Sequence, residues 1–517
     1  MNLSPFKNTP LYDLQNPEIE EALREAIQNE EASLGGELPM FVGGKELKTK
    51  ETFTSVDPCR PERVVGRFQL AGEKEAEQAV EAALKAFDSW RKVGAEERAE
   101  VLLRAASIAR KKRNSLIALI CLEIGKNWPE ADGEVCRLID FMEFYARDIF
   151  NYTAGEKLPP SPVEATEYRY LPLGVGLVVS PFNFPYALPA AAFLAAIVCG
   201  NTVIWKPSSD APSCAFRLYE IMREAGLPEG VLNIVTGPGN KIGDYMVAHP
   251  DVSFIAFTGS AAAGTEIYEK AAMRHPQQKR TKRVIAEMGG KNAIFVDTDC
   301  DLHSAVAGVI HSAFGYQGQK CSACSRLILL PQNYAQVLEQ VVKRSEELTI
   351  GPAVENKQLN AVINSRALDK IFSFIDQGKK EGRLLCGGEK FDGIDGGYYV
   401  KPTVFEGIDP FSSFNQEEIF GPILSVIKAK DLDEVLTIAN GTRYGLTGSV
   451  YSKNPEVIAR MKTEWEVGNF FINRGCTGAP AATHPFGGLK LSGTNTRVGG
   501  PRYLLSFLQD KFISSKY

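Results

Sequence analysis

Histidine is scarce in this chain, and no apolar run is long enough to cross a bilayer. Five of the 517 residues are histidines, and His303 and His311 lie eight positions apart on an expected helix. That spacing is too wide for two ligands of one metal ion, so we expect no metal. The longest apolar run, from Ala187 to Cys199, is shorter than a membrane span and contains Pro189. We expect it to form a buried helix.

A strong excess of either charge is also missing. The chain has 58 Lys and Arg against 63 Asp and Glu, which gives a net charge of −5 and a pI near 5.8. No basic surface for nucleic acid or an anionic membrane is therefore indicated. The polar, acidic start lacks the apolar core of a signal peptide, and several of the ten cysteines lie in apolar segments such as LIALICLEIG. We expect a cytoplasmic protein with reduced thiols and a small-molecule substrate.

The order of the expected elements predicts an α/β fold. At 44% hydrophobic residues the chain can bury cores for about two or three domains. Helical periodicity is present at 17–31, at 73–90 and from 95 to about 123. From Tyr168 onward, β-branched runs alternate with helical segments, and a second such set begins near Arg283. This alternation predicts parallel sheets covered on both faces, and the last twenty residues suggest a tail strand that pairs with another subunit.

Two glycine-containing turns are candidates for binding a dinucleotide. GPGNKIG follows an expected strand but misses the G-x-G-x-x-G fingerprint by one residue. FTGSAAAG fits better, because Gly259, Ser260 and Gly264 would leave the amino end of a helix open to a pyrophosphate. An ordinary strand-to-helix turn explains the pattern equally well. The residues alone thus indicate a nucleotide-binding α/β enzyme and nothing finer.

The stretch GYQGQKCSACSR holds two cysteines three residues apart. A zinc site would need two further ligands, and a thioredoxin-like dithiol would open a helix near the start of the chain. A single nucleophile fits better, because a thiol that attacks a carbonyl needs a nearby base and a donor for the oxyanion. Glu287 of EMGGKN and Asn183 of PFNFP could supply these groups, although an ion-pair carboxylate and a turn residue are the ordinary explanations.

Seven motifs together resemble the NAD(P)-dependent aldehyde dehydrogenase superfamily, and they span nearly the whole chain. They are PFNFP, WKPSS, FTGS-x-x-x-G, EMGGKN, GQKCSACSR, EEIFGP and PFGGLKLSG. The resemblance implies a Rossmann-like parallel-sheet NAD-binding domain from 1–148 and 172–286, with a helical extension at 1–50. It further implies an α/β catalytic domain at 287–475 and a small β flap for oligomerisation from 149–171 and 497–517. A homodimer or higher homo-oligomer is expected.

Within the superfamily, the sequence is most similar to the branch that oxidises L-glutamate γ-semialdehyde, formed from 1-pyrroline-5-carboxylate, to L-glutamate in proline degradation. The N-terminal extension, the two central motifs and NRGCTGA before HPFGG carry this resemblance. It implies an upstream proline dehydrogenase as a possible partner. Three alternatives stay open: a dehydrogenase for another semialdehyde, an enzyme that acylates coenzyme A, and a catalytically silent binding or structural protein on this fold.

The resemblance assigns the chemistry to three residues. Cys321 would attack the aldehyde and form a thiohemiacetal whose oxyanion is held by the Asn183 amide and the Cys321 backbone N–H. Oxidation would leave a thioester, and Glu287 would act as general base for the water that hydrolyses it. Cys324 would only pack.

Cofactor contacts follow from the same resemblance. Lys206 would meet the adenosine ribose, the FTGS turn the pyrophosphate, and Glu418 the nicotinamide ribose, with Phe420 packed nearby. Ser209 stands where strictly NAD-using relatives often have Glu. We therefore predict NAD as cofactor, with some tolerance of NADP.

Substrate contacts are implied at both ends of a zwitterionic aldehyde. Ser322 and the backbone of Gly478 and Ala479 would hold the α-carboxylate, and Phe184 and Phe486 would enclose the aliphatic middle. One position departs from the pattern: many relatives have an acidic residue on the helix that faces the substrate, where VCRLIDF places Arg137. A positive charge would then meet the substrate's ammonium group unless Arg137 points elsewhere.

Overall fold

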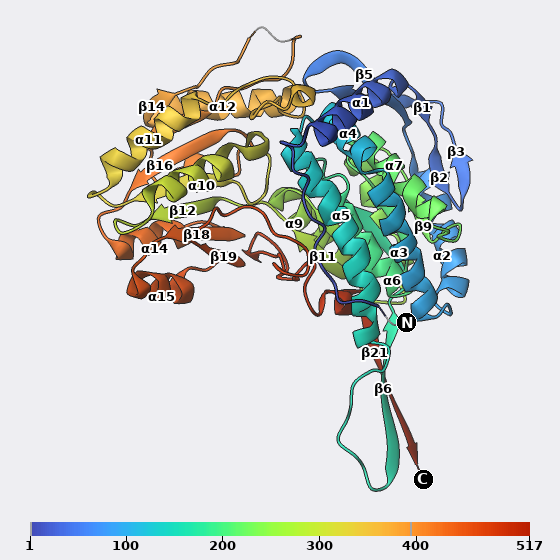
Figure 1. Cartoon of the computed structure of the whole chain (residues 1–517). Coiled ribbons are helices and arrows are strands. Elements are labelled where there is room, and N and C mark those ends of the chain that lie inside the picture. Colours follow the sequence, from blue (N-terminus) through green and yellow to red (C-terminus); the bar gives the residue numbers. More distant parts are fainter. Residues whose placement is uncertain (1–2, 393–394, 517) are drawn as a thin grey trace.

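Two seven-stranded sheets, one from each half of the chain, frame the molecule in this computed structural model, which describes residues 3–392 and 395–516 (Figure 1). The first sheet has the order β11-β10-β7-β8-β9-β2-β3, with bounds Arg283–Glu287, Val252–Thr258, Val175–Val179, Thr202–Lys206, Leu232–Ile234, Met40–Val42 and Lys45–Leu47. The second has the order β14-β15-β16-β13-β12-β18-β19, with bounds Arg383–Cys386, Thr403–Glu406, Ile423–Lys428, Cys324–Leu329, Asn292–Val296, Thr447–Tyr451 and Asn469–Ile472.

Helices from the same half of the chain surround each sheet (Figure 1). Around the first sheet they are α1 (Pro17–Ser33), α2 (Glu73–Trp90), α3 (Ala95–Lys111), α4 (Arg113–Ile124), α5 (Trp128–Asp148), α6 (Ala187–Val198), α7 (Pro212–Glu224), α8 (Asp244–Ala248) and α9 (Ala261–Ala272). Around the second they are α10 (Leu302–Phe314), α11 (Tyr334–Glu346), α12 (Ser365–Glu381), α13 (Ser413–Gln416), α14 (Leu432–Asn440) and α15 (Pro455–Glu464). The predicted α/β class is confirmed.

The sheets are parallel except at their edges. In the first sheet β2 runs antiparallel to both β9 and β3, and in the second β14 runs antiparallel to β15. The edge strands β2 and β3 come from the first 50 residues. The N-terminal extension was predicted to be helical, and it contains these strands as well as α1. Smaller sheets join β1 (Glu37–Leu38), β5 (Arg60–Gln69) and β4 (Thr52–Asp57), and β17 (Tyr444–Gly445) with β20 (Leu489–Lys490).

Two predicted elements divide in the structure. The helical block from 95 to 123 breaks at Lys112, between α3 and α4. The strand-rich run from Tyr168 becomes β6 (Glu164–Pro172) and β7, which belong to different sheets. Gly174 separates them with φ +138°, and a Cβ there would lie 2.5 Å from the Ser253 side-chain oxygen. The backbone needs glycine at this turn because other residues rarely adopt that φ.

A two-stranded ribbon projects from the body (Figure 1). Its strands are β6 and β21 (Leu508–Lys516), which pair antiparallel from Leu508 with Pro172 to Lys516 with Glu164. The tail thus forms the predicted strand, but one of its edges pairs with β6 of the same chain. Within residues 3–392 and 395–516, no helix combines the length and apolarity that a membrane span requires.

Candidate active site

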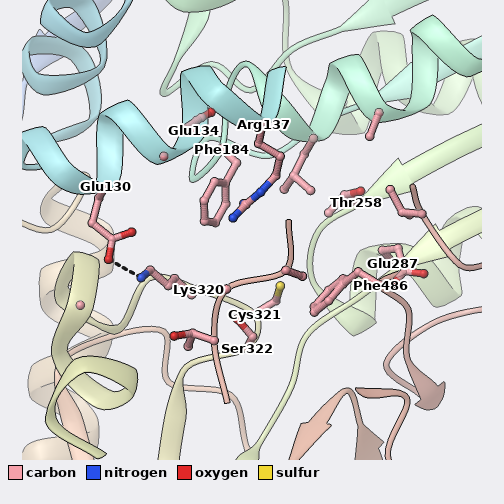
Figure 2. Close-up of a pocket in the computed structure, with 18 of the residues that line it drawn as sticks. Glu130, Glu134, Arg137, Phe184, Thr258, Glu287, Lys320, Cys321, Ser322 and Phe486 are labelled. Carbon is pink, nitrogen blue, oxygen red and sulfur yellow. Dashed lines mark hydrogen bonds and ion pairs between the residues drawn. The ribbon is translucent and has the colours of Figure 1, made fainter. Parts of the chain in front are cut away.

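A cavity of about 580 Å³ lies where the two sheets face each other. Its wall includes the carboxyl ends of β7, β10 and β11 from the first sheet and the segment before β13 of the second. Seven predicted site residues line it: Cys321, Glu287, Phe184, Ser322, Gly478, Ala479 and Phe486. In Figure 2, the Cys321 side chain has Glu287 and Phe486 on one side and Phe184 on the other. The structure therefore brings the predicted nucleophile, base and substrate contacts together.

The segment before Cys321 has a backbone that is held in place by buried side chains. Tyr316 and Gln317 have φ values of 51° and 55°, in the left-handed region. The Gln317 side-chain nitrogen donates to the carbonyls of Gly125 and Ala361, at 3.1 and 2.9 Å. These bonds anchor the turn to distant parts of the chain and offset the cost of its strained conformation.

The cysteine itself is fixed from its other side. The Asn292 side-chain nitrogen donates to the carbonyls of Cys321 and Ala323, at 2.8 and 2.9 Å. Cys321 is partly exposed, whereas Cys324 is buried in the core of the second sheet and its Sγ donates to the Arg326 carbonyl at 3.4 Å. The two cysteines of the motif thus face different surroundings, with one open to the cavity and one packed.

Burial and nearby acids keep the thiol protonated at neutral pH. Burial, then the charges of Glu418 and Glu287, raises the pKa of Cys321 to about 12. Burial also raises the pKa of Glu287 well above its usual range, offset in part by the Gly488 backbone N–H and Arg497. Neither carboxylate oxygen of Glu287 accepts a hydrogen bond of ordinary geometry from the described residues. This carboxyl group is therefore free to bind a water or a substrate atom.

Asn183 lies behind the cavity wall. It is buried, and its Nδ2 donates to the backbone carbonyl of Gln319 at 3.0 Å. It is not among the residues that line the cavity. The bond nevertheless links the amide to the segment that carries Cys321.

Buried charges on α5, which no motif indicated, stand beside the cavity. Glu134 pairs with Lys126 at 2.5 Å, both side chains being inaccessible to solvent, and also accepts from the Tyr186 backbone N–H at 2.9 Å. Glu130 pairs with Lys320 at 2.5 Å (Figure 2). Glu130 and Glu134 are four residues apart, and Arg137, which the sequence had already singled out, follows three residues later. This spacing places all three on one helix face and could have revealed the two acids.

The N-terminal arm, the described residues before α1, also contributes to the cavity, which no sequence motif indicated. The Thr9 and Tyr12 backbone N–H groups donate to Asp140 and Asp132 on α5, at 2.7 and 2.8 Å, and Leu11 lines the cavity. The arm has no hydrophobic periodicity, so no local pattern predicts that it lies here.

The predicted cofactor residues lie outside the wall of this cavity, at the ends of neighbouring strands. Lys206 ends β8 and Gly259 follows β10, and parallel strands bind ligands at such carboxyl ends. Burial lowers the pKa of Lys206 to about 8, and its ammonium donates to the Pro207 carbonyl at 3.2 Å. Ser209, three residues after Lys206, is exposed.

The turn at the start of α9 is open, as the FTGS motif suggested. Ser260 is exposed and caps α9, accepting from the Ala263 N–H at 3.3 Å. Gly264, predicted to leave this end of the helix open, is buried and closely packed. A Cβ there would lie 2.4 Å from the Met288 sulfur, so close packing against the end of β11 requires this glycine.

Glu418 and Phe420 lie near the glycines of EMGGKN. Glu418 accepts from the Gly290 N–H at 3.0 Å, and burial raises its pKa to about 7. A Cβ on Gly289 would lie 2.3 Å from a Glu418 carboxylate oxygen. Phe420 has φ 64° and meets Phe182 edge-on at 5.9 Å.

Comparisons with known proteins give one consistent result. The sequence model described as aldehyde dehydrogenase family matches residues 46–513. A 1-pyrroline-5-carboxylate dehydrogenase of Geobacillus sp. (strain WCH70) is 45% identical over 516 residues, which is 100% of both chains. A crystal structure of 1-pyrroline-5-carboxylate dehydrogenase from Thermus with bound NAD has a TM-score of 0.98 at 44% identity, covering 100% of both chains. Proline utilization A from Bdellovibrio bacteriovorus has a TM-score of 0.97 at 40% identity, covering 100% of this chain and 54% of that one.

Proposed function

This chain belongs to the aldehyde dehydrogenase family, and we propose that Cys321, Glu287 and Asn183 carry out its reaction. The reaction is the NAD-dependent oxidation of L-glutamate γ-semialdehyde, which forms from 1-pyrroline-5-carboxylate, to L-glutamate in proline degradation. One observation supports these roles above all: Cys321 and Glu287 line the same cavity as all five residues expected to contact the substrate.

Cys321 begins the reaction by attacking the aldehyde carbon. Because its thiol is protonated at neutral pH, carbon–sulfur bond formation must be accompanied by loss of the Sγ proton. The oxygen of the resulting thiohemiacetal gains negative charge, which the Asn183 amide and the Cys321 backbone N–H stabilise. Bound NAD supplies the oxidant that accepts hydride from this carbon, and the product on Cys321 is a thioester.

Glu287 completes the reaction by accepting a proton from the water that attacks the thioester. Its buried position raises its pKa, which makes the carboxylate a stronger base than an exposed glutamate. Hydrolysis frees the Cys321 thiol and releases the substrate carbon as a carboxylate. The unpartnered carboxylate oxygens leave both positions available for that water.

Several residues have the chemistry to hold NAD. The exposed turn at Gly259 and Ser260 presents N–H groups of the first turn of α9 to a pyrophosphate. The Lys206 ammonium and the Glu418 carboxylate supply a donor and an acceptor for ribose hydroxyls, and Phe420, two residues after Glu418, supplies an aromatic ring.

We also propose the setting in which the enzyme acts. The ribbon of β6 and β21 is the oligomerisation segment of a homodimer or larger homo-oligomer, since it projects from the body and exposes Phe512 at 58% (Figure 1). The chain divides into an NAD-binding domain (1–148 and 172–286) and a catalytic domain (287–475). All ten cysteines are free, which suits the cytoplasm. A proline dehydrogenase is the partner that supplies the substrate.

The decisive experiment is a steady-state assay of the purified protein with 1-pyrroline-5-carboxylate and NAD, followed as NADH absorbance. We expect turnover that the Cys321→Ala variant lacks, whereas Cys324→Ala, which alters a packed thiol outside the cavity, retains it. The proposal is wrong if the unmodified enzyme produces no NADH, or if Cys321→Ala is as active as the parent.

A further inference from the structure

Arg137 places a positive charge directly in the catalytic cavity. Its side chain lines the cavity wall on α5, and Figure 2 shows the guanidinium beside the Phe184 ring and directed toward the segment that carries Cys321. The guanidinium carbon lies 5.4 Å from the centre of that ring, within the range of a cation–π contact. The side chain therefore does not point away from the substrate.

The guanidinium has no anionic partner in the part of the chain that the structure describes. Its Nε is buried without a hydrogen-bond partner, and neither an ion pair nor a hydrogen bond joins Arg137 to another described residue. A cation–π contact satisfies the face of one ring but none of the N–H donors of the guanidinium. A half-buried guanidinium whose Nε is buried and unpartnered points to a ligand that supplies the acceptors.

The surrounding charges do not supply that partner. Three acids on α5 act on Arg137 through their charge. Glu134 and Glu130 are each in contact with a lysine, Lys126 and Lys320 respectively. Asp140 accepts hydrogen bonds from the Asn8 side chain and the Thr9 backbone N–H. Burial raises the pKa of Glu287, on the far wall, and no ion pair joins it to Arg137 among the described residues. Both acid–lysine pairs are neutral as units, and no described carboxylate lies within ion-pair distance of Arg137, so its guanidinium stands beside Phe184 without a direct counterion.

We propose that Arg137 binds the carboxylate of the substrate and makes this enzyme select aldehydes by their carboxylate more than by their ammonium group. This inference rests on the proposed function and refines its substrate class. A guanidinium fits a carboxylate through two parallel N–H donors. The same cation repels an ammonium group, so the α-amino group contributes little to binding on this wall. Aliphatic semialdehydes that carry a terminal carboxylate, with or without the amino group, are the expected class.

Three aldehydes separate the contributions: L-glutamate γ-semialdehyde, 5-oxopentanoate, which lacks only the amino group, and pentanal, which lacks both charged groups. We expect kcat/KM of the parent enzyme for the first two to agree within about 10-fold. Arg137→Gln should lower both by about 10- to 100-fold, mainly through KM, which is the range for a hydrogen bond to a charged group. The value for pentanal should stay within about 3-fold of the parent.

Two further variants make the test specific. Arg137→Lys keeps the charge but loses the paired donors, so it should recover part of the loss for both acids. Arg91→Gln removes an exposed arginine at the end of α2, outside the cavity, and should leave all three aldehydes unaffected. Should Arg137→Gln be unstable, competition by glutarate against the parent enzyme replaces it, and glutarate should inhibit where pentane-1,5-diol does not.

The outcomes divide cleanly. An equal loss for all three aldehydes would mean that Arg137 only positions Phe184, and no loss would mean that it binds nothing, so either result overturns the inference. A parent enzyme that prefers glutamate γ-semialdehyde over 5-oxopentanoate by more than about 10³-fold overturns it as well. If the parent enzyme oxidises pentanal or 5-oxopentanoate but never glutamate γ-semialdehyde, the proposed function fails while the role of Arg137 can still be measured.

Discussion

Asn183 donates a hydrogen bond from Nδ2 to the backbone carbonyl of Gln319, with the two atoms 3.0 Å apart. Gln319 precedes Cys321 by two residues, so the amide is attached to the segment that carries the nucleophile. An amide nitrogen carries two hydrogens, and this bond uses one. The second can donate to an oxyanion, while the first fixes the orientation of the group.

We expect Asn183→Ala to lower kcat by about 10²–10³-fold, because losing one oxyanion donor typically costs this much. KM should change little, since the donor acts mainly on charge that develops during the reaction. Steady-state kinetics and a thermal unfolding curve measure the two effects separately. A variant with normal kcat and a lowered unfolding temperature would show that Asn183 only braces the segment before Cys321.

Glu287→Gln should separate oxidation from hydrolysis. A glutamine keeps the shape of the side chain but cannot accept the proton of the attacking water, so the thioester on Cys321 should accumulate. We expect a burst of about one NADH per active site, followed by turnover at least about 10²-fold slower than that of the parent. Mass spectrometry of the intact protein should then detect an acyl adduct on the peptide that contains Cys321. A steady state with neither burst nor adduct would contradict this role.

The raised pKa of Cys321 predicts how its reactivity changes with pH. Only the thiolate is alkylated, and with a pKa of about 12 the thiolate fraction rises tenfold per pH unit throughout the range from 7 to 10. In the absence of NAD, the rate of iodoacetamide labelling of the Cys321 peptide should therefore increase up to pH 10 without a plateau. The charge of Glu418 raises this pKa, so Glu418→Gln should lower it and speed labelling at pH 9. A plateau near pH 8 in the parent would show that the thiol is activated.

The buried pair of Lys126 and Glu134 should matter more for stability than for chemistry. Lys126→Met leaves the carboxylate buried without its cation, which typically costs about 3–5 kcal/mol. In Lys126→Met/Glu134→Gln, the amide oxygen can still accept from the Tyr186 N–H, so most of the loss should be recovered. Guanidinium unfolding midpoints of the two variants test this difference. Equal midpoints would mean that the lysine does not compensate the charge of Glu134.

Features that depend on neighbouring residues were predictable from the sequence, whereas contacts between residues far apart in the chain were not. The order of strands and helices predicts the α/β class. Glycines and prolines mark turns around Asn183, Glu287 and Cys321, but only the resemblance of seven motifs to a known family assigned roles to these residues. The pairing of Lys126 with Glu134 lies in apolar and mixed segments without a distinctive pattern. Leu11 reaches the cavity only because the arm before α1 is attached to α5. Contacts of this kind depend on tertiary packing that local patterns do not encode.

The tail strand shows the same limit. The last twenty residues predicted a strand here, but pairing depends on which edge is available. The neighbouring β6 ends at Pro172, opposite Leu508, where β21 begins. The break at Gly174 frees β6 from the first sheet. Local sequence thus predicted the strand and could not predict its partner.

Ser209 should determine how strictly the enzyme chooses between NAD and NADP. Its exposed hydroxyl lies three residues after Lys206, and it carries no charge to repel a 2′-phosphate. We expect kcat/KM for NAD to exceed that for NADP by less than about 10⁴-fold. A site that actively excludes one of two similar ligands reaches a ratio of about this size. Ser209→Glu should increase the preference for NAD, because a carboxylate binds both ribose hydroxyls and repels the phosphate. Ser209→Gln, which has the same size without the charge, separates repulsion from crowding. If both variants exclude NADP equally, crowding is the cause and the argument from charge fails.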